Sequence, residues 1–185
     1  AQVVGTWQRM DGDGNAAALK QSTSGLFVGG DHAIGGGWRL GAALGYTDSR
    51  VRVDDRDSKA DVDTYSATVY SGKAFEAGPG QLNMLVGGAY SWHDINTTRQ
   101  AIVSNWNHTL KAGYDAHTYQ LFGELGYALP MGRSTIEPFA GLAWAKLNTP
   151  SFSESGGPTA LSGQSQSDDM ATGTLGLRVS TSLDL

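Results

Sequence analysis

The residue types that most often carry chemistry form neither a catalytic nor a metal-binding pattern in this sequence. The histidines are His32, His93, His108 and His117. Their spacing would not bring several imidazoles from one element to a single metal ion. The segment DGDGN at 11–15 begins like a calcium loop, but the twelfth position from Asp11 is a serine and not the glutamate that such a loop needs. Since the chain also has no cysteine and no serine in a G-x-S-x-G turn, we expect no enzyme activity, no metal site and no cofactor.

Four charged residues are of more interest because of the positions they share. They are Arg39, Glu124, Glu137 and Arg178. Each lies in a segment whose residues alternate between two kinds, and each falls on the alternation that otherwise holds mainly small or polar residues. The opposite alternation in these segments is apolar and carries no charge, although a soluble barrel would coat its outside with charges. The pattern predicts that these four side chains line a water-filled interior.

The alternation also defines the elements that must position these side chains. In QLNMLVGGAYSW, residues 81–92, one set of alternate residues is Leu, Met, Val, Gly, Tyr and Trp, and the other is Gln, Asn, Leu, Gly, Ala and Ser. The same period of two recurs along the chain and predicts eight β-strands. These strands cover 2–9, 25–30, 38–46, 65–75, 81–92, 119–127, 136–144 and 172–181.

Aromatic residues gather at the ends of the predicted strands, on the apolar alternation. Trp38 and Tyr46 bracket one strand, and they stand about 20 to 25 Å apart, which is close to the height of the apolar band between the two aromatic girdles of a transmembrane barrel. We therefore expect the apolar alternation to face lipid. The aromatic residues expected at the lipid interface are Trp38, Tyr46, Tyr90, Trp92, Tyr119, Tyr127 and Trp144.

The connections between the predicted strands alternate in length. Tight connections rich in glycine or proline cover 31–37, 76–80 and 129–134, and long hydrophilic ones cover 10–20, 48–61, 94–113 and 147–169. Outer-membrane barrels have short periplasmic turns and long external loops, so the first strand should run outward from the periplasm. The expected fold class is therefore all-β, a transmembrane antiparallel β-barrel of the bacterial outer membrane with about eight strands present. The net charge of -5 gives no reason to expect a nucleic-acid partner.

Several segments, in their order and spacing, resemble the translocator β-domain of bacterial autotransporters, the type V secretion proteins. They are TWQRMDGDG, GLFVGGDHAIGGGWRLGAALGYTDSRV, YSATVYSGKAF, GELGYALPMGRSTIEPFAGLAWAKLN and TGTLGLRVS. The resemblance implies a twelve-stranded outer-membrane barrel, a linker helix in its pore and an N-terminal passenger that is exported to the cell surface. It also implies outer-membrane lipid and the outer-membrane assembly machinery as partners. Against the family's pattern the chain begins at the first strand and ends at GLRVSTSLDL, about four strands early, so we expect residues 1–185 to be a fragment of the translocator domain.

Two alternatives stand beside what the resemblance implies. The resemblance implies that Glu124, Glu137, Arg178 and Arg39 contact the linker helix, whereas a solvated or mutually paired pore lining is the simpler interpretation. The whole chain could instead be a stand-alone eight-stranded barrel that acts as a narrow pore or, through its long loops, as an adhesin. A closed eight-stranded barrel fills its interior with side chains, but here the inward alternation is mostly glycine, alanine, serine and threonine. We therefore favour a wider barrel that exports a passenger.

Overall fold

The computed structural model describes residues 1–11, 18–53, 58–103 and 106–181, so most of the DGDGN segment lies outside the described residues. Its main element is one antiparallel sheet of eight strands that pair in the order β1-β2-β3-β4-β5-β6-β7-β10. The strands are β1 (Gln2–Met10), β2 (Leu19–Gly35), β3 (Trp38–Val53), β4 (Ser58–Ala77), β5 (Gly80–Val103), β6 (Trp106–Met131), β7 (Ser134–Thr149) and β10 (Gln166–Thr181). Each of the eight predicted strands falls inside one of these, so the all-β prediction is confirmed. No helix among the described residues is long and apolar enough to span a membrane.

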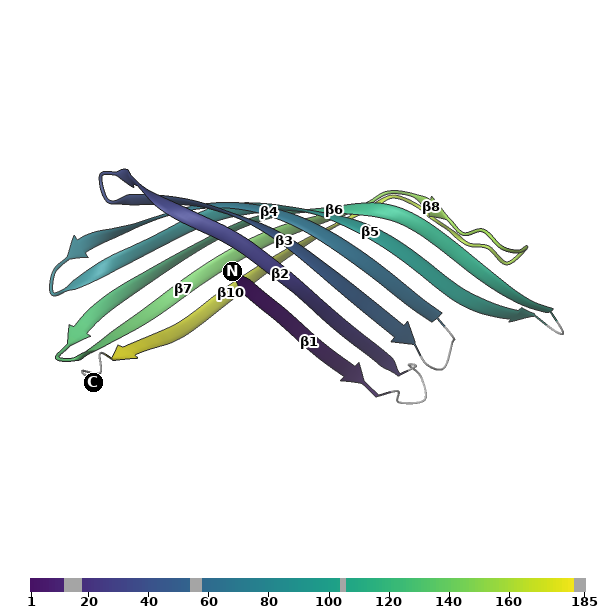
Figure 1. Ribbon diagram of the computed structural model, residues 1–185, viewed down its shortest axis with the longest axis horizontal. Helices are drawn as coiled ribbons and strands as arrows, with labels where there is room; N and C mark the ends of the chain where they lie inside the picture. The colour runs from purple at the N-terminus through teal and green to yellow at the C-terminus, as the bar shows by residue number, and fades with distance from the viewer. Residues whose placement is uncertain (12–17, 54–57, 104–105, 182–185) are drawn as a thin grey trace.

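The sheet curls into a half-barrel, as Figure 1 shows, and β1 and β10 form its two edges. Two-residue turns join β2 to β3, β4 to β5 and β6 to β7 at the left end of Figure 1. The first of these turns needs glycine, because Gly36 and Gly37 adopt φ values of 59° and 80°, where a side chain is disfavoured. Among the described residues no pairing joins β1 to β10, so the arrangement does not favour a closed barrel of eight strands.

The strands continue further toward the other end than the alternation predicted. Residues 48–53, 58–61 and 94–103, which we expected in long loops, are part of β3, β4 and β5. The hydrogen-bonded ladder carries on through these residues because backbone pairing does not depend on side-chain polarity. The sequence prediction stopped too early because polar residues occupy both alternations there and the period of two disappears.

The expected long loop at 147–169 also contains regular structure. A small hairpin of β8 (Phe152–Ser153) and β9 (Ser162–Gly163) follows β7 and packs against the end of β6. Phe152 stacks on Tyr114 with 4.6 Å between the ring centroids, and Leu110 of β6 is completely buried. Arg99 of β5 donates two hydrogen bonds to the Glu154 carboxylate, at 2.7 and 2.6 Å. The hairpin therefore covers one end of the half-barrel, at the right of Figure 1.

The two faces of the sheet differ in composition and in packing. The outer alternation exposes large apolar side chains, with Leu175 86% and Leu142 75% accessible. On the inner alternation four aromatic rings lie over glycines that face them on the neighbouring strand. The pairs are Phe27 over Gly45, Tyr70 over Gly41, Phe122 over Gly87 and Phe139 over Gly176. Because glycine leaves room for a ring beside it, side chains occupy more of the space along the inner face than its many small residues suggested.

Candidate functional site

Four polar side chains meet on the inner face near the tight-turn end of the sheet; we call them the inner cluster. Arg178 of β10 donates to the Glu124 carboxylate of β6, with nitrogen–oxygen distances of 2.7 and 2.8 Å. The same guanidinium lies 3.8 Å from the Glu137 carboxylate of β7 and 4.0 Å from the centre of the Phe139 ring. Asn83 of β5 donates a hydrogen bond of 3.0 Å to Glu137. Three of the four predicted interior charges thus form one connected group.

A glycine on an intervening strand lets two of these side chains meet. Glu124 and Arg178 belong to strands on either side of β7, where Gly141 pairs with Glu124. Asn83 and Glu137 belong to strands on either side of β6, where a Cβ at Gly126 would overlap the Glu137 carboxylate. Side chains from strands two apart approach each other on the concave side of a curved sheet. The cluster therefore lies on the concave face, as expected for the lining of a barrel.

The inner cluster keeps a net negative charge and remains open to solvent. It sets two carboxylates against one guanidinium, and the Arg178 side chain is 48% exposed. Pairing in such an exposed site contributes only about 0 to 1 kcal/mol to stability because water and salt screen it. The arrangement can therefore accept further donors, above all from a basic or amide-bearing segment lying inside the curve.

Arg39, the fourth predicted interior charge, stands apart from the inner cluster. It forms an ion pair with Asp31 across the β2–β3 hairpin, and the Ser71 hydroxyl donates a hydrogen bond of 2.9 Å to its backbone carbonyl. A groove of about 320 Å³ is lined by both Arg39 and Asn83. This groove runs along the inner wall between the Arg39 pair and the inner cluster.

Sequence reasoning missed Asn83, Asp31 and the ring of Phe139. Asn83 and Phe139 lie on the same alternation as the predicted charges, so the period of two already placed them on the inner face. What the sequence did not contain was the register between β5, β6 and β7, which brings residues far apart in the chain to one height. Knowledge of strand pairing was the missing signal.

The predicted interface aromatics lie in two rows on the outer face. At the long-connection end Tyr46, Tyr65 and Trp92 are neighbours, with ring centroids 5.2 and 6.1 Å apart. Tyr90 and Tyr119 follow at 5.3 Å, and Trp144 of β7 stands opposite Leu121. At the tight-turn end Trp38 meets Phe75 edge to face at 6.5 Å, and the Tyr127 hydroxyl donates to the Ala77 carbonyl at 2.6 Å. Their contact with lipid remains a prediction.

One histidine and several hydroxyl groups continue the polar lining of the inner face. His93 of β5 has one ring nitrogen 2.8 Å from the Thr64 hydroxyl and the other 2.8 Å from the Thr118 hydroxyl. Ser66 and Ser91 hydroxyls lie 2.8 Å apart between the same β4 and β5 strands. Within the described ranges, no three histidine, aspartate or glutamate side chains gather in a way that could hold a metal ion.

Comparison with known proteins identifies a family and two relatives. A model of the autotransporter beta-domain family matches residues 1–185. Two proteins of Serratia marcescens, each named an extracellular serine protease, are 37% and 36% identical to this chain over 182 and 181 residues. Each match covers 98% of this chain and 17% of the relative, so the chain spans only a small part of their length.

Solved structures share the curved antiparallel wall. The translocator domain of the autotransporter NalP from Neisseria meningitidis matches with a TM-score of 0.68 and 23% identity, over 99% of this chain and 60% of that one. The siderophore receptor PiuA from Acinetobacter baumannii matches with a TM-score of 0.51 and 12% identity, over 87% of this chain and 30% of that one. At these identities the likeness concerns the fold.

Proposed function

This chain belongs to the autotransporter β-domain family, and from that premise we propose that it exports an N-terminal passenger while the inner cluster holds the segment that joins passenger to barrel. The domain is a translocator β-domain of the bacterial outer membrane. The export of a passenger and the role of the inner cluster are our proposal. The observation that carries it is the concave, polar and net negative face around Arg178, Glu124 and Glu137.

The contrast between the faces supports a wall that separates lipid from a polar pore. A membrane strand must satisfy its backbone within the sheet and present apolar side chains to lipid. The outer face does this with Leu142, Leu175 and their neighbours, which are mostly exposed in the isolated sheet. The inner face carries the ion pairs and the hydroxyl groups, which suit water or a polar segment inside the barrel.

The edges of the sheet lead us to propose that the domain is part of a larger barrel. The chain aligns with 60% of the NalP translocator domain, and the outward-facing backbone groups of β1 and β10 have no strand beyond them in the described sheet. Unpaired edges of this length cannot remain in lipid, because each unsatisfied backbone group costs several kcal/mol. We propose that further strands complete the wall, and that outer-membrane lipid and the assembly machinery are its other partners.

The names of the two Serratia relatives make a secreted serine protease the first passenger class to test. In this proposal the proteolytic activity belongs to the passenger and the barrel performs no chemistry. β1 begins opposite Phe27, near the middle of β2, so a passenger attached to the N-terminal side of β1 would be joined to the sheet through a segment that starts between its two ends.

A charge exchange tests whether the inner cluster binds the connecting segment or only pairs with itself. In full-length protein, the single variants Glu124→Arg and Arg178→Glu should each assemble yet retain less passenger at the surface and conduct more ions across a planar bilayer. The double variant restores the pair with its charges reversed. If the cluster binds the segment, the double variant stays defective. If the cluster is only a paired lining, the double variant recovers, and the proposal is wrong.

The matched control for this experiment is Glu76→Gln. Glu76 also faces inward near a tight turn, but it accepts a hydrogen bond from Gln81 and is not connected to Arg178. It should leave both passenger display and conductance unchanged. Resistance of the folded barrel to unfolding by heat in detergent shows that each variant has assembled, so a loss of display can be assigned to the segment.

A further inference from the structure

A row of cationic side chains crosses the outer face near the long-connection end of the sheet. From β1 to β6 the row reads Arg9, Lys20, Arg52, Lys59, Thr98 and Lys111, each residue pairing with the next. All six positions continue the outer alternation that holds Tyr46 and Trp92. Like charges directly opposite each other on neighbouring strands destabilise a sheet. A row of this kind therefore favours an anionic partner.

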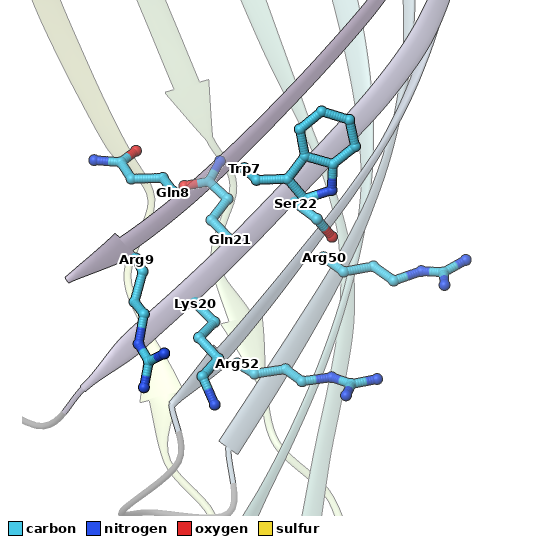
Figure 2. Close-up of a pocket in the computed structure, with 8 residues that line it drawn as sticks. All are labelled: Trp7, Gln8, Arg9, Lys20, Gln21, Ser22, Arg50 and Arg52. Atoms are coloured by element: carbon cyan, nitrogen blue, oxygen red, sulfur yellow. The ribbon is translucent and has the colours of Figure 1, made fainter. Parts of the chain in front are cut away.

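The N-terminal part of this row borders a groove of about 460 Å³. Figure 2 shows Arg50 and Arg52 extending side by side from β3, with the Trp7 ring above them. Trp7 is 82% exposed, so its ring offers an apolar face beside the guanidinium groups. Arg9 and Lys20 point to the lower side of the same groove in Figure 2. The groove thus combines several cations with one aromatic platform.

Among the described residues, three carboxylates lie beside the four cations of the groove. Asp11 lies 3.4 Å from Arg9, but both side chains are largely exposed. Asp48 and Asp61 lie 3.4 and 4.0 Å from Arg50, and all of these pairs are open to screening by salt. Arginine can bind phosphate or carboxylate through two parallel hydrogen bonds. The surface therefore keeps the capacity to bind an anion with phosphate or carboxylate groups.

The position of the row along the strand indicates which anion can reach it. A row of carboxylates separates it from the aromatic row. Across β3 to β6 this acidic row reads Asp48, Asp63, Asp94 and Asp115, each pairing with the next. It lies two residues beyond Tyr46, and Arg52 lies four residues further out. Phosphate at the level of the acidic row would be repelled.

A distance estimate places the Arg52 backbone beyond ordinary phospholipid head groups. Six residues of strand from Tyr46 to Arg52 rise about 20 Å, or about 14 Å along the membrane normal at the tilt of a barrel strand. The head-group layer of a phospholipid reaches only about 5 to 8 Å beyond the hydrocarbon. Anionic groups at the height of the Arg52 backbone must therefore be carried on a longer, polar head group.

We propose that this cationic surface binds the phosphorylated saccharide of an outer-leaflet glycolipid. Arg9, Lys20, Arg50 and Arg52 would bind its phosphate or carboxylate groups, and Trp7 would stack against a sugar ring. The proposal rests on the orientation given above, with the long connections outside the cell. It assigns to the outer face a lipid contact that is separate from the apolar band and from the inner cluster.

The test compares the variant Arg50→Gln/Arg52→Gln with wild type in full-length protein purified from outer membranes in mild detergent. The probes are lipopolysaccharide with a phosphorylated core, lipopolysaccharide without core sugars, and phosphatidylglycerol, each titrated by native mass spectrometry. Wild type should prefer the phosphorylated core, and the variant should bind it at least about tenfold more weakly, since two charge-assisted contacts are lost. Equal binding of all three probes by wild type, or unchanged affinity in the variant, would overturn the proposal.

Two kinds of control test separately where the glycolipid binds and how the sheet is oriented in the membrane. Lys73→Gln/Arg133→Gln removes two cations at the tight-turn end and should leave the affinity for the phosphorylated core unchanged, whereas Arg50→Lys/Arg52→Lys should retain most of it. The orientation is tested by Arg52→Cys in intact cells, which a membrane-impermeant maleimide should label. Failure to label would refute the orientation and with it the proposed function, whereas labelling together with unchanged lipopolysaccharide affinity would refute only the glycolipid contact.

Discussion

The inner and outer faces of the sheet share one backbone ladder but differ in the contacts that their side chains make. On the inner face, aromatic rings lie over glycines, and charges such as Arg178 and Glu124 reach across an intervening strand to meet. On the outer face, apolar side chains such as Leu142 stand exposed and aromatic rings form rows at the two ends. The difference shows that curvature, and not hydrophobic burial inside the domain, decides which side chains make contacts here.

The difference in polarity between the two faces changes along the strands. In the membrane-spanning part the outer face is apolar and the inner face is polar, but beyond Trp92 both faces are polar. There the inner face gains the β8–β9 hairpin, which buries Leu110, and the outer face gains the acidic and cationic rows. The two faces therefore remain different outside the apolar band, although hydrophobicity no longer distinguishes them.

The largest expected effect comes from placing one charge on either face. Val86→Arg and Leu142→Arg put a guanidinium on the outer face near mid-strand, and each should cost about 2 to 4 kcal/mol. Ala89→Arg and Ala143→Arg, on the inner face, should cost far less because their guanidinium groups reach water. Urea unfolding of the full-length protein in lipid vesicles measures the difference. Equal sensitivity of both faces would contradict the assignment.

A smaller effect should follow from adding one methyl group to either face. A Cβ at Gly87 would overlap the Phe122 ring on the inner face, so Gly87→Ala should destabilise the sheet by about 1 to 3 kcal/mol through overpacking. Gly30 lies on the outer face and a Cβ there would meet no atom within 4 Å. Gly30→Ala should therefore be neutral or stabilise by up to about 1 kcal/mol. The same unfolding assay distinguishes the two variants. Adding Phe122→Ala to Gly87→Ala should relieve part of the strain, since the new Cβ would still lie 2.8 Å from the Val69 carbonyl oxygen.

The smallest effect should be local to the β8–β9 hairpin and depend on pH. Hydrogen bonds from Arg99, and to a lesser degree from the Leu161 N–H, hold the pKa of the Glu154 carboxyl below 4.5. Because the folded pKa is lower than the unfolded one, the pair stabilises the hairpin fully above pH 4.5 and loses this effect as pH falls through the folded pKa. Cleavage within 152–163 by an acid-tolerant protease should therefore increase at low pH.

Glu154→Gln supplies the control for that prediction. It removes the carboxylate, so cleavage of the hairpin should be faster at neutral pH and should no longer change with pH. Cleavage at the tight turns, far from Glu154, should not respond in either protein. A pH-dependent increase that survives Glu154→Gln would show that another group is responsible.

The period of two was sufficient to predict the eight strands and the membership of each face. It placed Arg39, Glu124, Glu137 and Arg178 on one side of the sheet because side-chain direction follows directly from alternation. It did not predict that Arg178 meets Glu124 while Arg39 pairs with Asp31, because that depends on register between strands distant in the sequence. It also ended β3 to β6 too early and missed the β8–β9 hairpin, where polar residues on both alternations hide the pattern.

The most direct test of the account uses single cysteines at each position from 81 to 92 in the assembled outer-membrane protein. The domain has no cysteine of its own, so each introduced thiol reports one site. We predict that a probe at the even positions from 82 to 90 is quenched by brominated lipid, and that thiols at the odd positions react with a water-soluble maleimide. Absence of this alternation, or its inverse, would contradict the claim that one face of the sheet meets lipid and the other lines a polar pore.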